Sequence, residues 1–161
     1  MRIALLILLS ALIGRSCDSG LDLMTESGNV VTTLALADTN GLPQTTFHFG
    51  ESFDFTFGIT NLTQHAQTYH HTGPTVRFEI VQGDSILATS VDGLAWIQVV
   101  LEGSIPLGGS ESATWRGPKP LGGNPYFKLY PGQYSARAKL GYYFEAVRPA
   151  APPPVTFVVV P

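Results

Sequence analysis

The stretch FHFGESFDFTFGITN, residues 47–61, decides the fold. Its aromatic and aliphatic residues fall on odd positions, and most of the even positions between them are polar or glycine. A period of two is typical of a β-strand with one buried and one solvated face. Residues 50–52 interrupt the pattern without changing its parity, which fits a bulge or a short turn. We expect a turn followed by a main strand over 52–61. Since five of the nine phenylalanines lie here, this ribbon should be central to the core.

Other strand candidates are spread along the chain between turn-forming clusters of Gly, Pro, Asn and Asp. They are 30–37, 75–81, 85–90, 95–101, 110–115, 133–140 and 155–160. Short strands repeating every ten residues or so, with no helical periodicity, are typical of a β-sandwich. The sequence therefore predicts an all-β, immunoglobulin-like antiparallel β-sandwich of about seven to eight strands. Trp115 ends an alternating strand and is expected in the core, whereas the pattern leaves the role of Trp96 open.

The beginning of the chain predicts export. Arg2 supplies a small positive region, and the apolar run Ile3–Ile13 has eleven residues, which suits a signal-peptide core and is too short to span a bilayer. We interpret residues 1–16 as a signal peptide. Residues 17–29 are polar and contain Gly and Ser, so we expect a tether there, followed by one sandwich domain over 30–161.

Cys17 is the single cysteine of the chain, so it has no intramolecular disulfide partner. Small residues at Gly14 and Ser16 precede it, and the stretch resembles a bacterial lipoprotein signal, although that pattern usually has Leu where Gly14 stands. The resemblance implies a lipid on Cys17 and a membrane-anchored protein of the cell envelope. Simple secretion is the alternative.

The charge pattern argues against nucleic acid as a partner. Charged residues form only 13% of the chain, about half the usual share. Removal of residues 1–16 leaves seven basic and twelve acidic residues, and therefore a net charge of −5. Nucleic-acid binding normally requires clustered Lys and Arg, and the sequence has no basic run.

The sequence holds no motif of a known catalytic site. His65, His70 and His71 fall in one expected loop, residues 64–74, which raises the alternative of a metal-dependent enzyme. Adjacent histidines of an extended chain point in different directions, however, and no acidic residue lies between Asn61 and Arg77. No G-x-S-x-G or H-E-x-x-H pattern is present. We therefore expect a protein that is not an enzyme and uses no cofactor.

The order of several segments resembles a known family. FDFTFGITN (53–61) is followed by a Gly-Pro lead into VRFEIV (76–81), by Asp92-Gly93 with AWIQVV, by IPLGGSESATW (105–115) and by LYPGQYSARAKL (129–140). From about residue 45 to 145, this order is similar to that of the intracellular proteinase inhibitor (BsuPI) family, here in an exported, lipoprotein-like context. The resemblance implies an immunoglobulin-like sandwich that inhibits a serine proteinase. It transfers no inhibitory residue.

An inhibitor needs an exposed loop that enters a protease cleft, and the Gly- and Pro-rich residues 116–125 are our candidate. Arg116 and Lys119 would offer basic side chains there, and Pro120 would make the bond after Lys119 hard to cleave. The resulting hypothesis is an exported, non-catalytic binding protein with a protein partner, and proteinase inhibition as its specific version. The alternative is an adhesion or assembly module of the cell envelope.

Overall fold

A computed structural model of the chain describes residues 30–96, 98–118 and 127–161. These residues form eleven strands and no helix. None of them therefore forms a helix that could cross a membrane. The strands are β1 (Val30–Ala37), β2 (Thr46–His48), β3 (Phe53–Asn61), β4 (Gln67–His71), β5 (Val76–Gln82), β6 (Ser85–Thr89), β7 (Leu101–Ile105), β8 (Ser110–Gly117), β9 (Gly132–Leu140), β10 (Tyr143–Phe144) and β11 (Val155–Val160).

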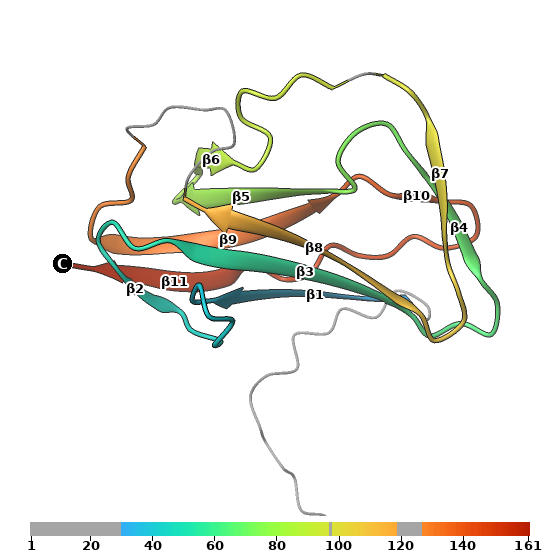
Figure 1. Cartoon of the computed structure of the whole chain (residues 1–161), viewed down its shortest axis with the longest axis horizontal. Coiled ribbons are helices and arrows are strands. Elements are labelled where there is room, and N and C mark those ends of the chain that lie inside the picture. Colours follow the sequence, from blue (N-terminus) through green and yellow to red (C-terminus); the bar gives the residue numbers. More distant parts are fainter. Residues whose placement is uncertain (1–29, 97, 119–126) are drawn as a thin grey trace, which may run out of the picture.

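Two sheets pack face to face and form a sandwich (Figure 1). One sheet has the order β1-β3-β8 and the other β2-β11-β9-β5-β6. All neighbours are antiparallel except β2, which runs parallel to β11. The arrangement is that of an immunoglobulin-like sandwich. The sheet β1-β3-β8 takes the places of strands A, B and E, and β11-β9-β5 of the other sheet takes the places of strands G, F and C. The predicted fold class is thus confirmed, and the D position beside β8 holds no strand among the described residues.

The phenylalanine ribbon lies at the centre of the core, as predicted. Phe53, Phe55 and Phe57 of β3 are buried. Phe53 packs on Phe157 of the opposite sheet with ring centroids 5.2 Å apart, and Phe55 contacts Trp115 at 4.7 Å. Each fully buried ring stabilises the fold by about 2 kcal/mol or more. Trp115 is 3% exposed, which confirms its expected place in the core.

A third, small sheet closes one end of the sandwich. Its order is β10-β4-β7, and it lies at the right of Figure 1. The prediction of a loop over 64–74 was wrong in part, because residues 67–71 form β4. Tyr69 of β4 is buried against Tyr142 and Phe144, with ring centroids 4.7 and 5.5 Å away. These partners lie far away in the sequence, so the local pattern could not show the strand.

Two further predictions were wrong. The described residues of 95–100 form no strand, and β7 begins only at Leu101, because no neighbouring strand pairs with this segment. Phe49 is 43% exposed although it belongs to the odd-numbered ribbon. It follows the end of β2 and precedes Gly50, whose φ of 83° turns the chain, so Phe49 stacks instead on Tyr130 at 5.6 Å. The predicted turn between two strands of the ribbon is confirmed.

Candidate functional site

The segment between β6 and β7 carries an unusual run of exposed apolar side chains. Leu94, Trp96, Val99, Val100 and Leu101 are 38%, 48%, 49%, 65% and 51% exposed. Single exposed apolar residues are normal on a protein surface, whereas several large ones close together are unfavourable unless a partner covers them. We name these five residues the apolar segment.

The start of the apolar segment lies beside β8, because Leu94 and Trp96 border a groove that Ala113 and Trp115 also line. In Figure 1 the chain passes from β6 along the top of the molecule to β7, above β5 and β8. Among the described strands, β8 pairs only with β3 and is therefore an edge strand. Val and Trp favour strands, so the segment has a strand-forming composition at the position where an immunoglobulin sandwich would place strand D. Among the described residues it nevertheless has no ladder partner before Leu101.

A shallow groove of about 200 Å³ lies beneath the start of this segment. The groove is lined by Leu94 and Trp96 of the apolar segment, by Phe78 of β5 and by Trp115 of β8. The indole Nε1 of Trp115 is buried and has no hydrogen-bond partner among the described residues. A buried N–H group without an acceptor lowers the stability of the folded protein by about 1–3 kcal/mol. The groove thus combines apolar walls with one unused donor beside it.

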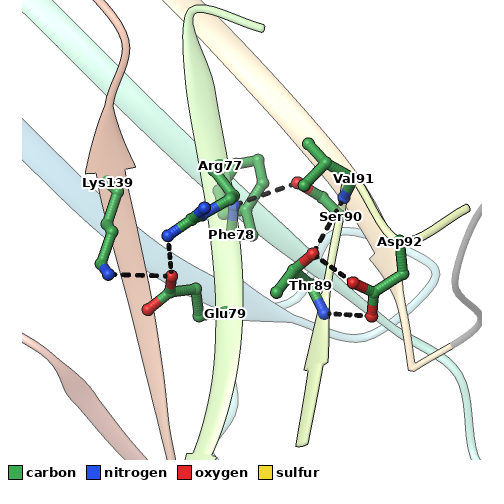
Figure 2. A network of polar contacts seen from close by, with 8 residues as sticks. All are labelled: Arg77, Phe78, Glu79, Thr89, Ser90, Val91, Asp92 and Lys139. Carbon is green, nitrogen blue, oxygen red and sulfur yellow. Dashed lines mark hydrogen bonds and ion pairs between the residues drawn. The ribbon is translucent and has the colours of Figure 1, made fainter. Parts of the chain in front are cut away.

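The beginning of the loop is fixed to β5 by a network of polar contacts (Figure 2). The Ser90 hydroxyl accepts a hydrogen bond from Phe78 N at 3.0 Å, and Ser90 N donates to Phe78 O at 3.0 Å. Asp92 accepts from both Thr89 N and Thr89 Oγ1, at 2.8 and 2.7 Å. This network orders residues 89–92 and fixes where the apolar segment starts.

A second polar feature occupies the outer face of the five-stranded sheet. Glu79 of β5 is fully buried, and its Oε1 lies 2.6 Å from Arg77 Nη2 and 3.1 Å from Lys139 Nζ (Figure 2). Arg137 of β9 lies opposite Glu79 in the strand ladder. We name Arg77, Arg137 and Lys139 the basic cluster. The sequence did not reveal it, because its members meet only through the pairing of β5 with β9.

Arg116, one of the residues predicted to bind a partner, is engaged within the sandwich. It lies on β8, and its Nε and Nη2 atoms contact the two carboxylate oxygens of Asp54 at 2.8 and 2.9 Å. The hydrogen bond from Arg116 lowers the pKa of Asp54, and the same contact raises the pKa of Arg116. Lys119 and Pro120 lie outside the described residues, as do Cys17, the predicted signal peptide 1–16 and the tether 17–29.

The histidines do not form a common site. His70 and His71 are adjacent on β4; His70 pairs with Glu145 at 3.2 Å, and His71 Nδ1 lies 2.7 Å from Gly73 O. His65 lies in the preceding loop. Within the described ranges, no three His, Cys, Asp or Glu side chains gather as metal ligands would. The geometry thus offers the metal-dependent alternative no ligand set in this part of the chain.

Comparisons with known proteins place the chain only at the level of distant structural likeness. No family model matches it, and no curated protein matches it. Among solved structures, a DNA-bound alkylpurine DNA glycosylase AlkC from Pseudomonas fluorescens is similar over 82% of this chain and 30% of its own, with 12% identity and a TM-score of 0.43. The CARDB domain of the PF1109 protein from Pyrococcus furiosus, in complex with di-metal ions, is similar over 86% and 97%, with 12% identity and a TM-score of 0.42.

A β-glucosidase from Listeria innocua is similar over 80% of this chain and 16% of its own, with 11% identity and a TM-score of 0.39. The chain thus spans less than a third of the glycosylase and of the glucosidase. At these identities and TM-scores, the three structures give no argument about what this protein binds or does.

Proposed function

We propose that this chain is an exported, non-catalytic binding protein whose protein partner covers the apolar segment. The observation that carries the proposal is the exposure of Leu94, Trp96, Val99, Val100 and Leu101, which lie close together within residues 94–101. Covering an apolar side chain gains about 25 cal/mol for each Å² removed from water. The stretch therefore offers the anchors that hold protein interfaces together, with Trp96 at its centre.

Two neighbouring features support a protein partner over a small molecule. The groove is shallow and has little polar lining, whereas small-molecule sites are enclosed and carry convergent polar groups. The edge of β8 beside it is unpaired in the described ladder, so an extended segment of a partner could add a strand there, as in other peptide-binding modules.

Proteinase inhibition is the specific version of this proposal that the BsuPI resemblance suggests. Arg116, which the sequence also predicts to bind the partner, forms an ion pair with Asp54 and keeps a side chain that is 60% exposed, so its role in binding stays a prediction. Residues 116–125, which include Lys119 and Pro120, remain the candidate inhibitory loop from the sequence. An adhesion or assembly role in the cell envelope is the alternative, and both versions share a protein partner and a lipid anchor at Cys17.

The test uses the purified chain and two matched variants. Trp96→Ser removes the central anchor, and Leu42→Ser removes an apolar side chain that is 64% exposed in the turn after β1. Each protein is measured against a panel of serine proteinases and in crosslinking with an envelope extract of the producing cell. We expect binding or inhibition that Trp96→Ser weakens at least roughly tenfold and Leu42→Ser leaves unchanged.

The same samples are analysed by sedimentation, because a second copy of the chain could cover the segment. Equal losses in both variants, or a self-association that buries Trp96 in place of a partner, would contradict the proposal. Absence of inhibition across the panel, with crosslinking intact, would remove only the proteinase version and leave the envelope module.

A further inference from the structure

The basic cluster is unexpected in an acidic protein. The described residues include six Lys and Arg side chains: Arg77, Arg116, Lys128, Arg137, Lys139 and Arg148. Three of the six meet on the outer face of β5 and β9, although the whole chain carries a net charge of −3. Like charges on adjacent strands are unfavourable unless an opposite charge neutralises them. Glu79 supplies one negative charge for three positive ones, so the cluster keeps a local excess.

The pairing around Glu79 leaves groups unused. Arg77 and Lys139 both contact Oε1, and their side chains are 40% and 54% exposed. Oε2 of Glu79 and Nε of Arg77 are buried and have no hydrogen-bond partner among the described residues. In Figure 2 Lys139 reaches Oε1 from β9 at the left, and Arg77 reaches it from above along β5. Unsatisfied buried polar atoms are rare in native proteins and indicate a water, an ion or a partner group that completes the site.

Arg137 is the free member of the cluster. It is exposed and lies opposite Glu79 in the ladder, and it forms no hydrogen bond or ion pair with any other described residue. A guanidinium offers five N–H donors in a planar fork that matches a carboxylate in a bidentate geometry. Beside it, Lys139 offers a point charge that Glu79 only partly neutralises. Together they form a ready receptor for a second, external carboxylate.

We propose that the basic cluster binds an acidic segment of a partner protein, with a Glu or Asp carboxylate held between Arg137 and Lys139. Three cations on a chain of net negative charge suit one or two carboxylates and are too few for the extended phosphate contacts of nucleic acid. The same sheet face also carries apolar side chains, because Val158 and Ile86 are 38% and 50% exposed beyond the cluster. A short segment with mixed acidic and apolar residues fits this combination.

This inference is independent of the apolar segment. Val76 and Phe78 of β5 point inward and contribute to the groove, whereas Arg77 and Glu79 alternate with them and lie on the outer face. The two surfaces therefore lie on opposite sides of β5. A variant can disable one of them and leave the other intact, which makes the two proposals separable.

The experiment measures binding of a dye-labelled oligoglutamate peptide to the full chain by fluorescence anisotropy. Arg137→Gln and Lys128→Gln remove the same charge from two exposed sites; only Arg137 belongs to the cluster, and Lys128 lies near Phe49 instead. We expect saturable binding of the peptide to the wild-type chain. Arg137→Gln should lower the binding affinity roughly tenfold, and Lys128→Gln should change it by less than about twofold. Added salt should weaken the binding of the wild-type chain.

Three outcomes would overturn the inference. They are the absence of saturable binding, equal losses in the two variants, and a cluster-dependent preference for a single-stranded oligonucleotide or for phosphatidylglycerol vesicles over the peptide. Trp96→Ser serves as a further control and should leave peptide binding unchanged. If that variant abolishes partner crosslinking but keeps peptide binding, the two surfaces are independent, as we infer.

Discussion

The phenol of Tyr69 lies 3.0 Å from both carboxylate oxygens of Glu111. This contact joins β4 of the small sheet to β8 of the sandwich. Burial and, after it, the hydrogen bond to Glu111 together raise the pKa of Tyr69 to about 12. The small sheet is therefore fixed to the sandwich by a hydrogen bond that exists only while the phenol keeps its proton.

Alkaline pH should weaken this connection. Tyr69 has an ordinary pKa of 10.0 in the unfolded chain and about 12 in the folded one, so the folded state holds the proton more tightly. The stabilisation is complete below about pH 10 and is lost as the pH rises toward 12. We expect Tyr69→Phe to lose about 1–3 kcal/mol of unfolding free energy at neutral pH. Urea titrations at several alkaline pH values should show a shallower pH dependence for the variant than for the wild type.

Tyr143→Phe is the matched control, since Tyr143 is 68% exposed on β10 of the same small sheet. It should leave both the unfolding free energy and its alkaline dependence unchanged. A wild-type pH dependence that persists in Tyr69→Phe would show that another group carries it, and would refute the role assigned to this contact.

Gly103 makes room for the Tyr69 ring. A Cβ built at Gly103 would collide with the ring carbons and the hydroxyl of Tyr69, which lies opposite Gly103 in the β4–β7 ladder. Overpacking of this kind costs about 1–3 kcal/mol. We expect Gly103→Ala to destabilise the protein by that amount in urea unfolding. Ser104→Ala, on the next and exposed position of the same strand, should be neutral within about 0.5 kcal/mol; equal stabilities would contradict the steric argument.

The sequence predicted the parts of the fold whose signal is local. The ribbon over 53–61 alternates with period two, and the burial of β3 alternates with it. Tyr69 gave no such signal, because its burial depends on Tyr142 and Phe144, which fold back from beyond β9. The buried position of Glu79 was hidden for the same reason, since Lys139 lies sixty positions along the chain.

The apolar segment shows a different limit of sequence reasoning. Residues 95–101 have the composition of a strand, and their propensity predicted one. A strand also needs a neighbour with free backbone groups in register, and this requirement is tertiary. The candidate inhibitory residues Lys119 and Pro120 stay predictions.

Asn61 connects the small sheet to the sandwich through its side-chain amide. Nδ2 donates to His65 O at 2.8 Å and to Ile105 O at 2.9 Å, and Oδ1 accepts from Thr63 N and Oγ1. The side chain is fully buried, so the Asn-Leu-Thr glycosylation pattern that begins here is inaccessible in the folded protein. Asn61→Asp replaces two donors by an acceptor that faces carbonyl oxygens, and should cost about 3 kcal/mol or more. Hydrogen exchange should quicken first in β4 and β7.

Leu62→Ala changes the neighbouring side chain, which is 56% exposed, and serves as the control for Asn61→Asp. It should leave hydrogen exchange in β4 and β7 at the wild-type rate. If Asn61→Asp instead accelerated hydrogen exchange equally over the whole sandwich, the small sheet and the sandwich would unfold together. That result would contradict the local role assigned to Asn61.

The pair formed by Asp54 and Arg116 should give a small stabilisation that is lost in acid. The hydrogen bond from Arg116 holds the pKa of Asp54 below its ordinary value of 3.8, so the stabilisation is present above that pH and fades as the pH falls through the lower, folded pKa. Arg116 is 60% exposed, and exposed ion pairs contribute less than about 1 kcal/mol. Arg116→Ala should therefore lower the unfolding free energy slightly at neutral pH and converge with the wild type in acid. If Arg116→Ala also abolished partner binding while stability changed this little, Arg116 would contact the partner itself, as the sequence predicts; unchanged binding would contradict that prediction.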